Sequence, residues 1–159
     1  MHDTETAVTA AVFAAVFIAL YIGHLLGDHV AQTSAQAAAK GGPGWPARLA
    51  CARHVTTLTL TKALVLAPVV VVLHLPVTAL GLVVGGTLDL LSHYWADRRF
   101  TLLRLIEAIG KSSYVTHCTV VRKPGDAEAA TGPGTGAFEI DQVWHVLWLG
   151  IAALIIAAL

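Results

Sequence analysis

The chain has 159 residues, of which 56% are hydrophobic and 13% charged, and its formal net charge is zero. Soluble domains carry roughly 25% charged residues, so one soluble core of this length cannot bury so much apolar surface, and the composition predicts a polytopic membrane protein of one domain. The neutral balance, without a long basic run, argues against a nucleic-acid partner. Cys51 and Cys118 lack a C-x2-C spacing and are expected to be free thiols.

The first predicted membrane helix runs from about residue 7 to 27, a length that spans a bilayer. The residues before it are acidic and contain no Lys or Arg, unlike the start of a secretion signal, so we expect this helix to remain in the mature protein. A Gly- and Pro-rich stretch at 41–46 then predicts a turn. The second helix is expected at about 47–73, with Pro68 kinking it or ending its regular part.

The third helix is expected at about 77–96, after a tight turn at 74–76. Apolar residues at helical spacing in 101–110 predict a short amphipathic helix lying on the membrane surface. A loop follows, and a fourth helix at about 140–159 carries Trp144 and Trp148 near its start as interfacial anchors. The predicted fold class is therefore all-α, with a four-helix transmembrane bundle and one interfacial helix in a single domain, 1–159.

The Lys and Arg residues predict the orientation of this bundle. The first and third connections and their flanks carry basic residues, whereas the N-terminal tail, the 74–76 turn and the C-terminus carry none. The positive-inside rule therefore places loops 28–46 and 97–139 in the cytoplasm and both termini outside, in a bacterial inner membrane. The basic residues concerned are Lys40, Arg48, Arg53, Arg98, Arg99, Arg104, Lys111, Arg122 and Lys123.

His and Asp residues four apart occur at the end of the first and third predicted helices and at the start of the fourth, and a further His opens the second. A spacing of four places both side chains on one helix face, and the predicted topology gathers all of them at the cytoplasmic end of the bundle. Imidazole with carboxylate suits zinc first, then iron or manganese, as one or two ions. The expected metal ligands are His24, Asp28, His54, His93, Asp97, Asp141 and His145.

Each of these residues also has a plainer interpretation. A single His near a helix end is usually hydrogen-bonded, and a His/Asp pair is often a local ion pair, so a structural polar network or proton relay is the alternative. Lys62 and Asp89 lie about 12 Å deeper than His54 and Asp97 and are predicted to form a buried ion pair. Arg98 and Arg99 would bind an anionic group of a substrate, or they are simply positive-inside residues.

Two glutamines complete the pattern. Gln32 lies one turn beyond Asp28 and Gln142 follows Asp141, so either could hold a ligating imidazole or make ordinary interfacial hydrogen bonds. The pattern H-L-L-G-D-x3-Q, then Lys40, His54, S-H-x3-D-R-R and D-Q-x2-H resembles a bacterial family of small membrane proteins that carry a domain of unknown function. It is more distantly similar to membrane-bound proteins described as metal-dependent hydrolases. The resemblance implies a metal-binding membrane protein, and it supplies no substrate.

We therefore expect an integral membrane metal-dependent hydrolase that acts on a lipid-like or phosphoester substrate. Asp28 or Asp141, where not bound to metal, would be the general base. The rival functions are an ion or proton transporter, a haem or di-iron redox protein, and a non-catalytic metal-binding or structural protein. The membrane lipid is the expected partner, and Gly81, Gly85 and Gly86 offer a close-packing surface for a homodimer.

Overall fold

The computed structural model describes residues 2–159 and consists of helices joined by turns and one long loop, with a single isolated bridge between Val120 and Ala129. The first long helix is continued by a π-helical turn, η1, and three short helices lie in the connections. The elements are α1 (His2–Leu26), η1 (Gly27–Ala31), α2 (Ser34–Ala39), α3 (Gly44–Val72), α4 (Ala79–Asp97), α5 (Phe100–Ala108), α6 (Ser112–His117) and α7 (Gly136–Ala158).

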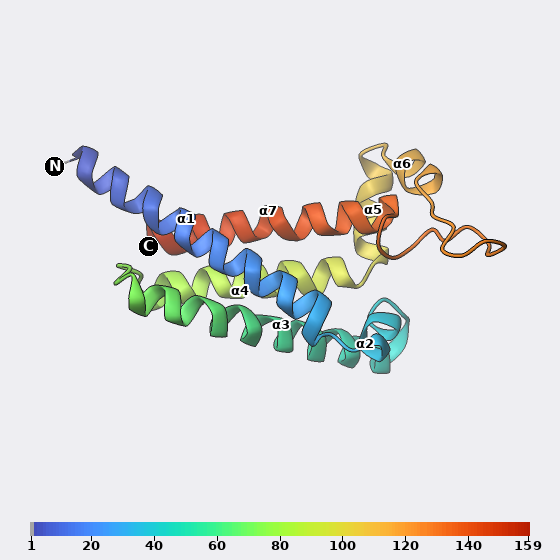
Figure 1. Cartoon of the computed structure of the whole chain (residues 1–159), viewed down its shortest axis with the longest axis horizontal. Coiled ribbons are helices and arrows are strands. Elements are labelled where there is room, and N and C mark those ends of the chain that lie inside the picture. The colour runs from blue at the N-terminus through green and yellow to red at the C-terminus, as the bar shows by residue number, and fades with distance from the viewer. Residues whose placement is uncertain (1) are drawn as a thin grey trace.

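The four long helices form an elongated bundle that runs up, down, up and down (Figure 1). Helix α1 packs against α3 and α7, and α4 packs along α7, whereas α3 and α4 contact each other less extensively. Both termini and the α3–α4 turn lie at one end of the bundle, and α2, α5 and α6 lie at the other. The first and third connections therefore share one end, as the sequence predicted.

Three segments of the described chain are long and apolar enough to cross a membrane, and the prediction of four was wrong in this respect. Helix α4 has 19 residues and buries polar side chains along its length, Asp89 and His93 among them, which lower its hydropathy. It still packs against α7 and completes the four-helix bundle. The three candidate spans are Asp3–Ala31, Gly44–Val72 and Gly136–Ala158.

The apolar core occupies the half of the bundle nearest the termini. Val16 of α1, Leu66 of α3 and Leu149 of α7 are buried there in one cluster. Gly85 of α4 sits so close to α7 that a Cβ would lie 2.8 Å from the backbone oxygen of Ala152. Gly81 and Gly85, two of the three glycines expected to form a dimer surface, thus pack against α7 of the same chain.

The helix boundaries differ from the predicted ones mainly at the connections. Helix α3 continues through Pro68 to Val72, so the proline does not end the regular helix. Helix α7 begins at Gly136 because the Thr135 hydroxyl accepts a hydrogen bond from the Phe138 amide, which caps its first turn. Helix α5 turns its apolar face to the protein: Leu102 and Ile106 are buried against Ala96 and neighbouring residues of α6 and α7.

Candidate metal centre

All four predicted imidazoles meet at the end of the bundle away from the termini. The His93 ring stacks on the His145 ring with centroids 3.8 Å apart, and the His24 and His54 rings each lie 5.5 Å from His93. Each of the four side chains is at most 2% exposed. Four helices therefore contribute one buried imidazole each to a single cluster.

The three predicted carboxylates join this cluster, with Asp97 at its centre. Asp97 Oδ2 lies 3.2 Å from Nε2 of His54 and 3.4 Å from Nε2 of His93. Asp28 Oδ1 lies 3.2 Å from the same nitrogen of His54. The third carboxylate, Asp141, places Oδ2 3.4 Å from Nε2 of His145 and is about a quarter exposed, at 24%. All seven predicted residues are thus brought together.

These polar atoms lie close to one another without forming hydrogen bonds of good geometry. Within residues 2–159, buried atoms of the cluster that have no hydrogen-bond partner include Nε2 of His54, His93 and His145, Oδ1 of Asp28 and Oδ2 of Asp97. A buried polar group left unpaired costs about 1–3 kcal/mol, so a convergence of several requires an explanation. Imidazole nitrogens and carboxylate oxygens aimed at a common point are the donor set of a metal site.

Two groups of three residues have ligand atoms close enough to hold an ion. In each group the three atoms lie within 4.8 Å of one another. One group is Asp28, His54 and His93, and the other is His93, Asp97 and His145, so His93 belongs to both. His24 and Asp141 lie beside these groups rather than in them, which leaves their predicted role as direct ligands a prediction.

The α1 end of the cluster is shaped by a π-helical turn. His24 lies in the last turn of α1, and η1 begins at Gly27, so the change from α- to π-helix falls between His24 and Asp28. Gln142 of α7 bridges these two residues: its Oε1 lies 3.3 Å from His24 Nε2, and its Nε2 donates to Asp28 Oδ2 at 3.3 Å. Single π turns occur frequently at functional sites.

Gln32 holds the imidazole of His54 from the other side. Its side-chain nitrogen lies 2.8 Å from His54 Nδ1, while His54 Nε2 faces the carboxylates. An amide offers either a donor or an acceptor when its plane flips, so Gln32 orients the ring in either tautomer. Both glutamines thus make the contacts with the cluster histidines that the sequence suggested.

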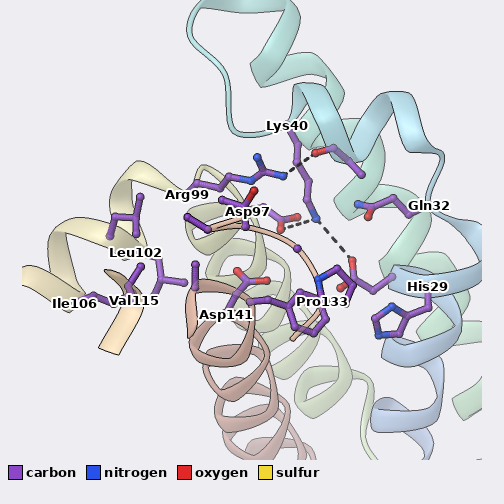
Figure 2. Close-up of a pocket in the computed structure, with 18 residues that line it drawn as sticks. His29, Gln32, Lys40, Asp97, Arg99, Leu102, Ile106, Val115, Pro133 and Asp141 are labelled. Carbon is purple, nitrogen blue, oxygen red and sulfur yellow. Dashed lines mark hydrogen bonds and ion pairs between the residues drawn. The ribbon is translucent and has the colours of Figure 1, made fainter. Parts of the chain in front are cut away.

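Lys40 is the site residue that the sequence analysis did not assign to the centre. Its ammonium lies 2.7 Å from Asp97 Oδ1 and 3.6 Å from Asp28 Oδ1, and its side chain is buried (Figure 2). Burial alone would lower the pKa of Lys40, but Asp97 and Asp28 outweigh it and raise that pKa above its ordinary value. The only signal in the sequence was its place in the motif, between Gln32 and His54.

The two arginines after Asp97 have different surroundings. Arg98 is buried and donates from Nη1 to the Lys40 carbonyl at 2.8 Å and from Nη2 to the Gly42 carbonyl at 2.5 Å, so it holds the turn that carries Lys40. Arg99 is exposed, donates to the Ala37 carbonyl at 2.8 Å and has a φ of +56°, which is strained for a residue with a side chain. Of the two, Arg99 lies at the cavity described next, and the anion-binding role remains a prediction.

A cavity of about 420 Å³ borders the carboxylate side of this cluster, where Asp28, Asp97 and Asp141 line it (Figure 2). Its lining combines polar residues, among them Lys40, Arg99 and Asp141, with apolar ones such as Leu102 of α5 and Phe138 of α7. The cavity is therefore amphipathic, with the carboxylates and the ammonium among its polar lining groups. The side chain of His29 also lines it, but His29 is exposed and lies outside the cluster.

Lys62 and Asp89 form a buried ion pair between α3 and α4, as predicted. The pair lies deeper in the bundle than the histidines and is not in either group of three ligands. Cys51 and Cys118 are free thiols, also as predicted; Cys51 is buried and its Sγ lies 3.7 Å from the Tyr94 carbonyl. None of these residues belongs to the centre.

The family model described as "Protein of unknown function (DUF3307)" matches residues 16–159. The chain belongs to this family. The match covers the second part of α1, all of α3, α4 and α7, and every residue of the cluster, which agrees with the resemblance to a membrane family of unknown function. No curated protein and no solved structure matches, so the more distant similarity to metal-dependent hydrolases receives no support from these comparisons.

Within the DUF3307 match, the buried histidines and aspartates form groups that could hold a metal ion, and this is the most specific chemical property of the chain. The family description assigns no reaction, so any activity must be inferred from this centre and the cavity beside it.

Proposed function

We propose that the chain is an integral membrane metal-dependent hydrolase whose centre acts on a lipid-like or phosphoester substrate at the cytoplasmic face. The observation that carries this proposal is the set of unpaired, buried imidazole nitrogens and carboxylate oxygens that converge beside an amphipathic cavity. His93, shared by both groups of three, would be the central ligand. Zinc fits this donor set first, with iron and manganese as alternatives.

A divalent ion held here would supply Lewis-acid chemistry, polarising the scissile group and making water more acidic. Residues of the chain would accept the proton and hold the ion. Asp141 is partly exposed, lines the cavity and lies outside both ligand groups, so it would accept the proton of the attacking water. Asp28, the other predicted base, belongs to a ligand group and would serve as a ligand.

The mixed polar and apolar lining of the cavity supports a lipid-like or phosphoester substrate. Arg99 would hold an anionic group, and the apolar lining residues, including Leu102 and Phe138, would hold a hydrocarbon portion. Basic residues cluster at this end of the bundle, which supports the cytoplasmic placement of the centre. A membrane lipid combines these two chemical parts and would reach the cavity from the leaflet.

A transport function has less support. On the way from the centre to the opposite end of the bundle, the ion pair of Lys62 and Asp89 is followed by the apolar core around Val16 and Leu149. That core is buried and offers no polar side chain to pass an ion onward. Metal-dependent flux into liposomes would be the result that revives a transporter.

The test is metal analysis together with hydrolysis assays on detergent-purified protein. We expect the wild type to carry stoichiometric metal, His93→Ala to lose both metal and hydrolysis, and Asp141→Asn to keep the metal but lose hydrolysis. His117→Ala is the matched control, since His117 is an exposed histidine of α6 outside the cluster. A wild type that binds no metal after reconstitution would overturn the proposal, as would a His93→Ala variant with full metal content.

A further inference from the structure

We infer that the centre takes a single divalent ion and that Lys40 provides the second cation of the site. This inference rests on the metal centre proposed above and specifies its composition. The Lys40 ammonium lies between two carboxylates, 2.7 Å from Asp97 Oδ1 and 3.6 Å from Asp28 Oδ1, so a second ion bound by both carboxylates would compete with it for this position. In two-metal carboxylate bundles the carboxylates of facing helices bridge the ions.

The charges of the cluster favour one ion. Within the described residues, the charged side chains that converge on the cluster are the carboxylates of Asp28, Asp97 and Asp141 and the ammonium of Lys40. Their net charge is −2, because the ligating imidazoles are neutral. One divalent ion neutralises this charge, whereas two would leave an excess of two positive charges in a largely buried site, which is costly.

Other charged groups that the structure describes near the cluster do not contact its carboxylates. Arg98 and Arg99 direct their guanidinium groups to the backbone carbonyls of residues 37–42. Lys62 is already paired with Asp89. The charges in direct contact within the cluster are therefore those of the three carboxylates and Lys40.

The arrangement of the ligand atoms also indicates one metal ion, without reference to charge. The two groups of ligand atoms share His93. A neutral imidazole offers one free ring nitrogen, so His93 can serve only one ion at a time. The two groups are therefore alternative or overlapping parts of one site rather than two separate sites.

The position of Lys40 also gives it a task toward the substrate. Lys40 lines the cavity together with Arg99 and Asp141. Its ammonium is anchored on Asp97 and held by a turn that Arg98 fixes through the Lys40 and Gly42 carbonyls. A preorganised cation at the cavity wall stabilises negative charge that develops on a substrate oxygen, which is the role a second metal ion has elsewhere.

The experiment is a titration with Mn²⁺ and with Zn²⁺ of metal-depleted, detergent-purified protein, read as ions bound per chain. We expect a ratio of one for the wild type and for Lys40→Arg, and a ratio approaching two for Lys40→Met, in which an uncharged chain of similar length vacates the second position. Electron paramagnetic resonance should show isolated Mn²⁺ in the wild type and a spin-coupled pair in Lys40→Met. Lys111→Met, which removes an exposed lysine, is the control and should keep a ratio of one.

The outcomes separate this inference from the proposed function. A wild-type ratio of two refutes the role of Lys40 and leaves the metal centre intact, and a wild-type ratio of zero refutes both. A ratio of one in a folded Lys40→Met variant, with unchanged affinity, shows that Lys40 does not take the place of an ion. If circular dichroism shows that Lys40→Met has lost its helices, Lys40→Gln and the wild-type ratio decide the question.

Discussion

The spacing between α1 and α3 should control the metal centre, and Gly23 offers a direct way to perturb it. Gly23 lies so close to α3 that a Cβ would be 2.6 Å from the Cα of Lys62, a backbone atom that no rotamer change can move away. Carbon atoms in contact prefer separations of about 3.5–4.0 Å, so Gly23→Ala requires the two helices to separate by roughly 1 Å. Overpacking of this kind costs about 1–3 kcal/mol.

The consequence for the centre follows from its ligands. Asp28 follows Gly23 on η1 and His54 precedes Lys62 on α3, and the two ligands belong to one group. Metal–ligand distances tolerate changes of about 0.2 Å, so a shift of roughly 1 Å should break this group and lower metal affinity at least about tenfold.

The assay is a metal titration of the detergent-purified variants, with thermal unfolding followed by circular dichroism. Gly86→Ala is the matched control on α4, because a Cβ there meets no described atom within 4 Å. Gly86→Ala should leave the metal affinity unchanged, and the stability of the protein should stay the same or rise slightly. Wild-type affinity in Gly23→Ala would refute the argument that close packing of these two helices sets the ligand geometry.

Two further substitutions test the surroundings of the centre. Gln32→Leu removes the contact with His54 Nδ1 and should lower metal affinity by about 10–100-fold while leaving the helix content intact; an unchanged titration would show that Gln32 only fills space. Lys62→Met should destabilise the protein by about 3–5 kcal/mol because it leaves the Asp89 carboxylate buried alone, and Lys62→Met/Asp89→Leu should recover most of that loss in denaturant unfolding. The single variant Asp89→Leu completes the comparison. If the losses of unfolding free energy in Lys62→Met and Asp89→Leu simply add in the double variant, the two residues are not energetically coupled.

The ligand cluster was predictable because its signals survive in the one-dimensional sequence. His93 and Asp97 are spaced for one helix face, and ionisable residues inside apolar segments are rare enough to stand out. The alternation of basic and uncharged connections then fixed which helix ends meet. These three rules require no knowledge of how the helices pack, and the structure brings all seven predicted residues together.

Lys40 and the π turn were not predictable from the same rules. Lys40 lies in a connection, and its side chain reaches the centre only because α2 and the turn after it fold back over the bundle, where Arg98 holds the carbonyls of Lys40 and Gly42. Periodicity carries no information about such a path. The sequence pattern does not predict the π turn at Gly27 either. At this turn the chain lies close to α3, where a Cβ on Gly27 would lie 2.2 Å from Leu58.

The number of spanning helices was mistaken for a related reason. The stretch was taken to be apolar throughout, but α4 turns Asp89, His93 and Asp97 into the protein, while apolar side chains such as Leu80 and Val83 are exposed on its outer face. Hydropathy averages over all faces of a helix, so a helix that is polar inside and apolar outside has an intermediate value. Two of the residues that lower the hydropathy of α4, His93 and Asp97, belong to the groups that could hold a metal ion.

The apolar core and the polar cluster lie in different halves of the bundle. The cluster half holds several buried polar atoms without partners, each of which costs about 1–3 kcal/mol. Val16 and Leu149 lie in the other half, eight residues before His24 and four after His145, in an apolar core that can offset this cost. Because the same continuous helices carry both halves, the packing of the core fixes the helix positions that the ligands require. A centre of unpaired polar groups can therefore persist in a small protein only where rigid helices extend from a well-packed core, and this bundle has that arrangement.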